Sequence, residues 1–152
     1  MSAQNIALPD ADATLRLGMD LGKSLTAGSV LLLTGELGSG KTTLVQGLAR
    51  GLNIDDAIVS PTFTIINEYF GGRLPLYHLD LYRLTTAEVD ELQLESYWDG
   101  IETQLGIVAI EWAQRLSYLP ADFTRLELTY DRVDGRIAKI STISEKLVFG
   151  VE

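Results

Sequence analysis

The octet Gly35-Glu36-Leu37-Gly38-Ser39-Gly40-Lys41-Thr42 matches the phosphate-binding pattern G-x-x-x-x-G-K-[ST] at every required position. It follows the continuously apolar residues 30–33, which are typical of a strand buried on both faces. Apolar residues of the segment 41–50 then recur at helical spacing, and Gly51 stands where a left-handed helix terminator is expected. A strand, a glycine-rich loop and a helix in this order predict a P-loop.

The chemistry of a bound triphosphate explains this order of residues. Glycines in the loop let backbone N–H groups turn inward at the positive end of the helix that begins at Lys41. Lys41 is expected to bridge the β and γ phosphates, and the Thr42 hydroxyl to bind Mg²⁺. Further donors are available nearby from Ser39 and Thr43. A glycine-rich turn that only caps a helix is the alternative, which the strand before and the helix after it disfavour.

Length and composition predict a single domain spanning residues 1–152. A chain of 152 residues buries roughly 70% of its unfolded surface and can fold without staples. The chain has no cysteine, which excludes disulfides and thiolate chemistry and fits a reducing compartment. Because no signal-peptide pattern opens the chain and no apolar run approaches 18 residues, the sequence predicts a soluble, cytoplasmic protein.

The charge balance argues against direct binding of nucleic acid. Twelve basic residues against 21 acidic residues give a net charge of −9. A protein that grips nucleic acid through its phosphates needs the opposite sign. We therefore expect no tight, direct binding to RNA or DNA. The lack of a long apolar run predicts no membrane association either.

The pattern outside the octet predicts the elements around the P-loop. Asp10 is placed to cap a first helix that ends near Gly28. Two glycine-containing pairs, beginning at Gly71 and Asp134, are hairpin signals. Strands are expected at residues 65–70, 74–79, 107–110, 126–130 and 136–140, and helical residues at 85–95. Together these elements predict a P-loop NTPase of the α/β class, a three-layer α/β/α fold with a mostly parallel sheet and antiparallel C-terminal strands.

Two carboxylates end predicted strands and compete for the role of the second acidic group that a P-loop enzyme needs. Asp80 ends one strand and Glu111 ends the more uniformly apolar one. Both are expected at the carboxyl edge of the sheet, where ligands bind. We assign the metal to Glu111, directly or through water, and the positioning of water to Asp80. The alternative for each is a solvated carboxylate that caps the next helix.

The hydroxyl-rich segment Ser60-Pro61-Thr62-Phe63-Thr64 is a candidate switch that senses the γ phosphate. Thr64 or Thr62 would offer its hydroxyl to Mg²⁺ or water, and a plain turn before a strand is an equally supported interpretation.

Four further side chains near the two acids can each be interpreted in two ways. His78, the only histidine, is interpreted as a hydrogen-bonded structural residue and not as a base. Trp112 is either a platform at the rim of the site or a core residue. Arg83 and Arg115 are the arginines nearest the acids; either could stabilise charge in the transition state, but surface salt bridges are the favoured interpretation.

Five stretches together resemble one known family: LPDADATL, GELGSGKTT, SPTFTIINEY, YHLDLYRL and VAIEW. From residue 8 to about residue 135 the chain is similar to the TsaE family, a small bacterial ATPase of tRNA threonylcarbamoyladenosine (t6A) biosynthesis. The resemblance implies an Mg²⁺-dependent ATPase, largely inactive alone, that acts as a switch on a complex of two partners similar to TsaB and TsaD. That complex would modify adenosine 37 of tRNA. Ala113 departs from the proline that many members carry after the tryptophan.

The same resemblance implies the ligands ATP and Mg²⁺ and a set of site residues. The nucleotide-binding residues would be Ala11, Leu37, Gly38, Ser39, Gly40, Lys41, Thr42, Thr43, Asp80 and Arg136. The catalytic residues would be Lys41, Asp80 and Thr64, and the metal-binding residues Thr42 and Glu111.

Two other function classes compete with this one. A small-molecule or nucleotide kinase on a P-loop core would need a second pocket and usually a lid with arginines, yet residues 85–104 contain no arginine. A module that binds nucleotide without hydrolysing it is distinguished by whether Lys41→Ala or Asp80→Ala abolishes turnover while nucleotide binding and partner docking persist.

Overall fold

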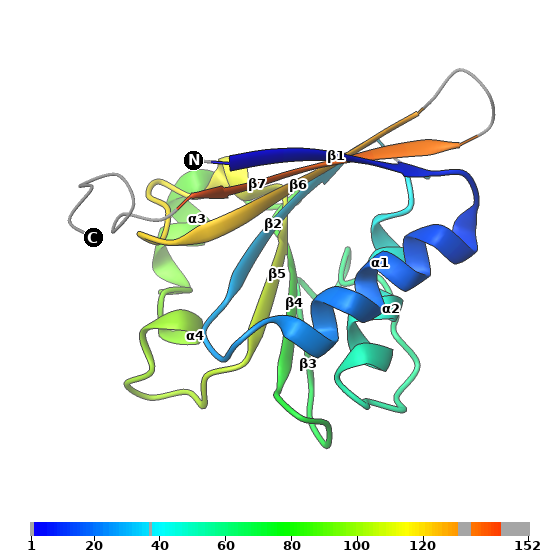
Figure 1. Cartoon of the computed structure of the whole chain (residues 1–152). Coiled ribbons are helices and arrows are strands. Elements are labelled where there is room, and N and C mark those ends of the chain that lie inside the picture. Colours follow the sequence, from blue (N-terminus) through cyan, green and yellow to red (C-terminus); the bar gives the residue numbers. More distant parts are fainter. Residues whose placement is uncertain (1, 37, 131–134, 144–152) are drawn as a thin grey trace.

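The structure, a computed structural model, describes residues 2–36, 38–130 and 135–143. Its strands are β1 Ser2–Leu8, β2 Val30–Gly35, β3 Ile66–Tyr69, β4 Leu76–Asp80, β5 Ile107–Glu111, β6 Phe123–Tyr130 and β7 Arg136–Ile143. Its helices are α1 Ala11–Ser24, α2 Lys41–Gly51, α3 Thr86–Glu91, α4 Ser96–Asp99 and the 3₁₀ turn η1 Ala113–Arg115. The strands form one sheet in the order β1-β7-β6-β2-β5-β4-β3 (Figure 1).

The four central strands, β6, β2, β5 and β4, are parallel, and the strands at both edges are antiparallel. The expected α/β P-loop fold is therefore confirmed. The antiparallel pairs β3–β4 and β6–β7 were expected, whereas β1, which pairs with β7, was not. Of the predicted C-terminal turn, Asp134 lies outside the described residues.

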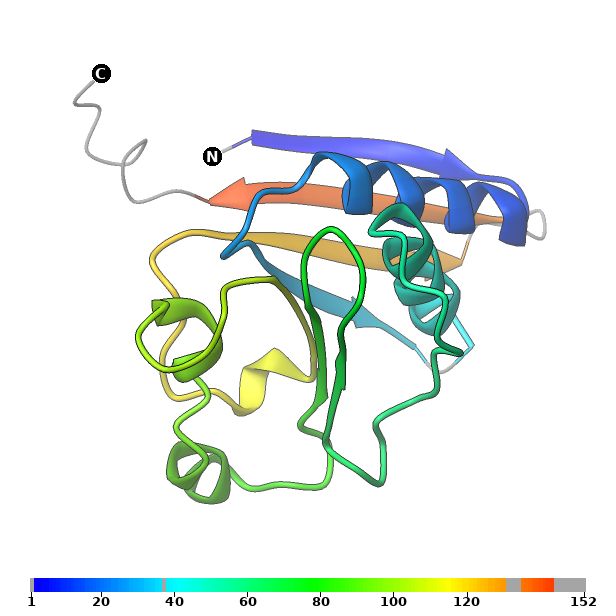
Figure 2. The same cartoon turned by 90° about the horizontal axis from the view of Figure 1, so that it is seen from below.

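The helices lie on both faces of the sheet, which gives three layers (Figure 2). On one face α1 and α2 cover a cluster that includes Leu31, Leu33 and Ala109. On the other face α3, α4 and η1 cover a cluster that includes Leu32 and Ile110. Alternate residues of the buried strands thus enter opposite layers. In the described part of the chain, no helix has the length and apolar character that crossing a membrane requires.

The helix ends match the predictions only in part. Asp10 caps α1 as expected, since its carboxylate accepts a hydrogen bond of 2.8 Å from the Ala13 amide. The helix ends at Ser24, four residues before the expected end near Gly28. The role predicted for Gly51 as a left-handed terminator is wrong: Gly51 is the last residue of α2, and the positive φ, 62°, falls on Asn53.

Gly51 instead belongs to a set of four glycines through which α1 and α2 touch, two on each helix, spaced four residues apart. They are Gly18 and Gly22 of α1, and Gly47 and Gly51 of α2. A Cβ atom added at Gly47 would lie 3.0 Å from the Gly18 Cα and closer still to the Leu15 carbonyl oxygen. The two backbones therefore approach so closely that no side chain fits between them.

We predict that Gly47→Ala destabilises the protein. Alanine improves helix propensity by about 1 kcal/mol, but overpacking against a backbone costs about 1–3 kcal/mol or more, so the net change is a loss. Urea unfolding followed by far-UV circular dichroism measures it. The matched control is Gln46→Ala, on the exposed side of the same helix, which should change the free energy of unfolding by less than about 0.5 kcal/mol. A Gly47→Ala variant as stable as the control would contradict the close packing.

Candidate nucleotide-binding site

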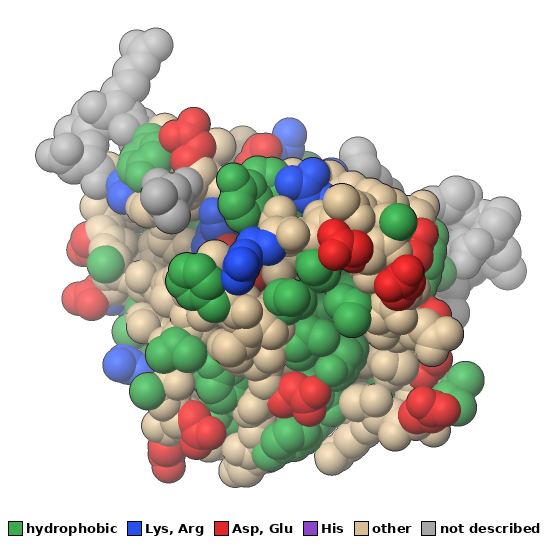
Figure 3. Space-filling view, turned by 180° about the vertical axis from the view of Figure 1, so that it is seen from behind, with side chains coloured by type: hydrophobic (Ala, Val, Ile, Leu, Met, Phe, Trp, Pro, Cys, Tyr) green, Lys and Arg blue, Asp and Glu red, His purple; other side chains and the backbone are tan. Residues whose placement is uncertain are grey.

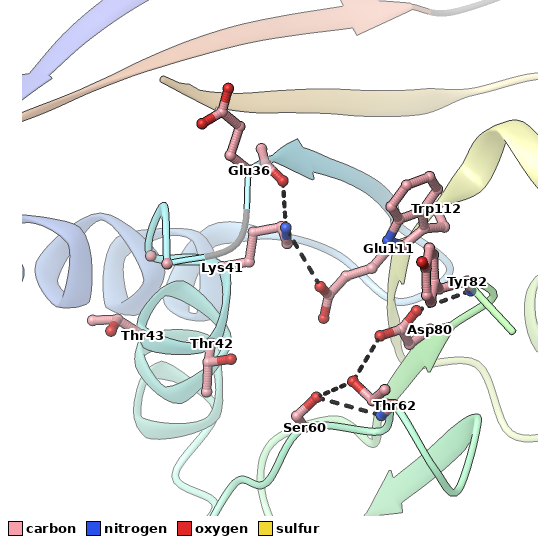
Figure 4. A pocket seen from close by; sticks show the side chains of 13 residues that line it. Glu36, Lys41, Thr42, Thr43, Ser60, Thr62, Asp80, Tyr82, Glu111 and Trp112 are labelled. Atoms are coloured by element: carbon pink, nitrogen blue, oxygen red, sulfur yellow. Dashed lines mark hydrogen bonds and ion pairs between the residues drawn. The ribbon is translucent and has the colours of Figure 1, made fainter. Parts of the chain in front are cut away.

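A cavity of about 770 Å³ opens between the start of α2 and the carboxyl ends of β4 and β5 (Figure 4). Its lining combines the glycine-rich loop, the hydroxyl-rich segment and both strand-end acids. The lining residues are Gly35, Glu36, Gly38, Gly40, Lys41, Thr42, Thr43, Ser60, Thr62, Asp80, Tyr82, Glu111 and Trp112. Seven predicted binding or metal residues are thus brought together at one site: Gly38, Gly40, Lys41, Thr42, Thr43, Asp80 and Glu111.

The loop takes the backbone shape that its glycines allow. Gly38 and Gly40 have φ angles of 80° and 108°, in the region that residues with a Cβ rarely adopt. Gly40 then caps α2 without a side-chain hydrogen bond, so the first amides of the helix have no capping side chain. The Lys41 ammonium donates to the Gly35 carbonyl and lies 4.0 Å from Glu111 Oε1. A positive helix end and a lysine together suit an anion.

The two acids are neighbours because their strands are paired in register. Asp80 of β4 lies directly beside Glu111 of β5 in a parallel ladder. Both residues are only 6% exposed, although both line the cavity. Asp80 Oδ1 accepts a hydrogen bond of 3.0 Å from the Tyr82 amide. The sequence-based expectation that both acids reach the same edge of the sheet is confirmed.

Of the two candidate threonines, Thr62 and not Thr64 faces the acids. The Thr62 hydroxyl donates to Asp80 Oδ2 at 3.2 Å and lies 2.7 Å from the Ser60 hydroxyl. Figure 4 shows this series of hydrogen bonds, from Ser60 through Thr62 to Asp80. Thr64, which we assigned to the catalytic group, is not among the lining residues; its hydroxyl donates to Asn67 Oδ1 at 2.6 Å.

Two other predicted nucleotide contacts, Ala11 and Ser39, are not among the lining residues. Ala11 is an exposed residue at the start of α1 and is not part of the cavity lining. Ser39 is buried, and among the described residues its Oγ has no hydrogen-bond partner. Leu37 lies outside the described residues.

Arg136 contacts the carbonyl groups of the glycine-rich loop and does not line the cavity. Its guanidinium donates to Gly38 O at 3.1 Å and to Ser39 O at 3.2 Å, and it lies 4.1 Å from the centre of the Tyr130 ring. Arg136 therefore holds the loop in the present arrangement, from the last strand of the sheet.

An aromatic pair forms the rim of the cavity. The rings of Tyr82 and Trp112 lie 4.7 Å apart between centroids, and both residues line the cavity. Trp112 also packs against the core cluster behind it, so its rim and packing roles coexist. The two nearby arginines rest on aromatic rings: Arg115 over Trp112 at 5.3 Å and Arg83 over Phe63 at 5.2 Å.

His78 is hydrogen-bonded, as interpreted from the sequence, but its partner is a site residue. Its Nε2 atom lies 2.8 Å from Glu111 Oε2, and its side chain is fully buried. One signal was available in the sequence: His78 precedes Asp80 by two residues in a strand, so both side chains face the same way.

The donor set of the cavity fits Mg²⁺ held together with a triphosphate. Thr42, Asp80 and Glu111 offer hard oxygen atoms, which Mg²⁺ prefers. Within the described ranges, no group of three or more His, Cys, Asp or Glu side chains could cage a metal alone. Mg²⁺ usually takes only one or two protein ligands and completes its shell with phosphate and water, which is the arrangement this site allows.

Comparison with known proteins identifies the family of the chain. The family model described as "Threonylcarbamoyl adenosine biosynthesis protein TsaE" matches residues 8–138. A protein of Nostoc sp. strain PCC 7120 with the name "tRNA threonylcarbamoyladenosine biosynthesis protein TsaE" is 60% identical over 136 residues, which are 90% of this chain and 84% of that protein. A protein of the same name from Synechocystis sp. strain PCC 6803 is 58% identical over 75% of this chain and 73% of its own length.

A solved structure shows the same architecture. The crystal structure of YdiB from Bacillus subtilis superposes with a TM-score of 0.79 at 30% sequence identity, over 97% of this chain and 90% of that one. The segment matched by the family model, residues 8–138, contains the glycine-rich loop, both acids and the hydroxyl-rich segment. The chain therefore belongs to the TsaE family.

Proposed function

We propose that this protein binds and hydrolyses Mg²⁺-ATP in the cavity described above, as the ATPase component of tRNA t6A biosynthesis. Hydrolysis acts as a conformational switch on partner proteins, the TsaB- and TsaD-like components, in the cytoplasm. The proposal draws on family membership for the pathway and on the site for the chemistry. One observation carries the chemistry: a single cavity joins the P-loop lysine and threonine to two strand-end carboxylates.

Each side chain has a role that its position supports. Lys41, already at the cavity wall, neutralises the charge of the β and γ phosphates. Thr42 and Glu111 would hold Mg²⁺, which would supply positive charge to stabilise the phosphates. Asp80 orients the attacking water, and Thr62 fixes the Asp80 carboxylate through its hydroxyl.

The hydroxyl-rich segment has features of a switch. Ile65, the residue that follows it, has a φ of 72°, a conformation that is strained for a β-branched residue. The Ile65 carbonyl accepts a hydrogen bond of 2.9 Å from the Asp80 amide, so Asp80 is bonded both to Thr62 of the segment and to the residue that follows the segment. A change in this segment therefore alters the surroundings of Asp80 directly.

Slow hydrolysis by the isolated protein follows from the distribution of arginines. Arg83 and Arg115 lie on aromatic rings, and neither lines the cavity. An arginine that reaches the transferred phosphoryl group typically raises the rate 10³- to 10⁵-fold. No arginine of residues 2–36, 38–130 and 135–143 lines the cavity, so these residues leave a weak ATPase that a partner can complete.

Exposed apolar side chains beside the cavity suit contact with a protein. Phe63 is 80% exposed and Tyr82 53% exposed, and both flank the Thr62–Asp80 contact in sequence. On the face seen from behind, hydrophobic side chains gather in the middle, with both basic and acidic side chains around them (Figure 3). Because the chain carries a net charge of −9, we assign tRNA contact to the partners and not to this protein.

The kinase alternative has less support. Residues of α3 and α4 pack on the sheet face opposite α1 and α2, through Val89 and Trp98 among others. None of the residues of α3 or α4 lines the cavity, so this segment does not serve as an arginine-bearing lid.

We expect the isolated protein to release phosphate from ATP slowly, and faster when the TsaB- and TsaD-like partners are added. Glu111→Ala should lower the Mg²⁺-dependent rate at least about tenfold, because loss of a group that only orients a metal ligand already costs about 10- to 100-fold. A colorimetric phosphate assay, run beside a search for phosphorylated small molecules or nucleotides, separates hydrolysis from transfer.

The matched control is Glu102→Ala, an exposed acid that does not line the cavity, which should keep the wild-type rate. Phosphate recovered on an acceptor in place of free phosphate would replace the ATPase proposal by the kinase alternative. Nucleotide binding and partner docking without any turnover would leave only a binding module.

We further predict that Thr62→Val lowers turnover about tenfold, because a hydrogen bond to a charged group is worth about 1.5 kcal/mol or more. Thr64→Val is the matched control, since it removes the same hydroxyl from a residue that bonds to Asn67 outside the cavity. Steady-state ATP hydrolysis at saturating Mg²⁺ compares the two. Equal losses in both variants, or a larger loss for Thr64, would return the catalytic role to Thr64.

A further inference from the structure

His78 is a buried polar residue next to the cavity but not part of its lining. It belongs to β4 and pairs with Ala109 of β5. Its strand neighbour on the same face, Leu76, and Ala109 both belong to an apolar core cluster. The surrounding core therefore does not require an imidazole, and the one polar atom that His78 contacts among the described residues is Glu111 Oε2, at 2.8 Å.

The direction of this hydrogen bond follows from the chemistry of the two groups. An ionised carboxylate only accepts hydrogen bonds, so His78 Nε2 must donate. Nδ1 is buried and has no partner in the described structure. A proton on Nδ1 would leave a buried N–H without an acceptor, which is unfavourable. The neutral tautomer with its proton on Nε2 satisfies Nε2 and avoids a buried N–H at Nδ1, which then remains an acceptor without a partner among the described residues.

Among the described residues, this is the one hydrogen bond that the Glu111 carboxylate makes. The other carboxylate oxygen, Oε1, lies 4.0 Å from the Lys41 ammonium, beyond hydrogen-bond distance, and Lys41 donates to the Gly35 carbonyl. The terminal torsion of a glutamate has only broad preferences, so packing or a hydrogen bond must fix the carboxylate plane. His78 supplies that bond from a fully buried strand, where it has little freedom to move.

We infer that His78 is a positioning residue for Glu111: its Nε2–H holds Oε2 on the core side, so that Oε1 faces the cavity and the Mg²⁺-bound nucleotide. The inference rests on the proposed function. It adds that the His78 imidazole orients the metal-binding carboxylate of Glu111. Partners that orient metal-binding groups typically contribute 10- to 100-fold in metal affinity or activity.

The test compares the Mg²⁺ dependence of nucleotide binding in His78 variants. Calorimetric titration with a non-hydrolysable ATP analogue, repeated over a series of Mg²⁺ concentrations, gives the Mg²⁺ midpoint. We expect His78→Leu to raise this midpoint at least tenfold and to leave binding without Mg²⁺ unchanged. His78→Gln places an amide N–H near the position of Nε2 and should return the midpoint to within about threefold of wild type. His78→Asn, with the same amide on a shorter chain, should not.

Two controls separate orientation of Glu111 from loss of packing. Tyr77→Phe removes a hydroxyl that donates to Gln104 O at 2.6 Å on the opposite face of the same strand, and it should leave the Mg²⁺ midpoint unchanged. In a Glu111→Ala background, His78→Leu should cause no further change, because its effect runs through that carboxylate. Should His78→Leu fail to fold, the Gln and Asn pair carries the comparison.

A wild-type midpoint in His78→Leu, equal midpoints in His78→Gln and His78→Asn, or an added effect in the Glu111→Ala background would each overturn the inference and leave the proposed function intact. If the wild-type protein binds the analogue at no Mg²⁺ concentration, the proposed function fails and the inference fails with it.

Discussion

Parallel pairing of β5 between β2 and β4 is the constraint on which the rest of the site depends. The ladder places Glu111 beside Asp80 on one side and beside Leu33 on the other, two residues before the glycine-rich loop begins at Gly35. Because all three strands run the same way, their carboxyl ends reach one edge of the sheet together. The acids and the lysine are far apart in sequence, and this pairing alone brings them into one cavity.

The elements that the sequence predicts well are those with strong local signals. The apolar run of β2, the glycine-rich loop and the apolar face of α2 are adjacent in the chain, so their order predicts the P-loop without any long-range information. Asp10 caps α1 as expected because an N-cap interacts only with the next turn. The carboxyl-end position of Asp80 and Glu111 follows from strand direction, which the P-loop fold determines.

The features that were missed depend on contacts between distant segments. The edge strand β1 has no clear alternation and forms through pairing with β7. Gly51 resembles a helix terminator locally, yet it is required by the close approach of α1. The choice between Thr62 and Thr64 depends on the turn that ends at Ile65, whose positive φ no sequence rule predicts for isoleucine. The partner of His78 lies 33 residues away on another strand.

Arg136 completes a closed series of contacts that begins and ends at the glycine-rich loop. The loop leads into α2, α2 packs through its glycines on α1, and α1 follows β1. Strand β1 pairs with β7, and β7 begins with Arg136, which returns to the loop carbonyls. These contacts preorganise the described part of the loop, so under the proposed function little of the nucleotide's binding free energy would be spent on ordering the backbone.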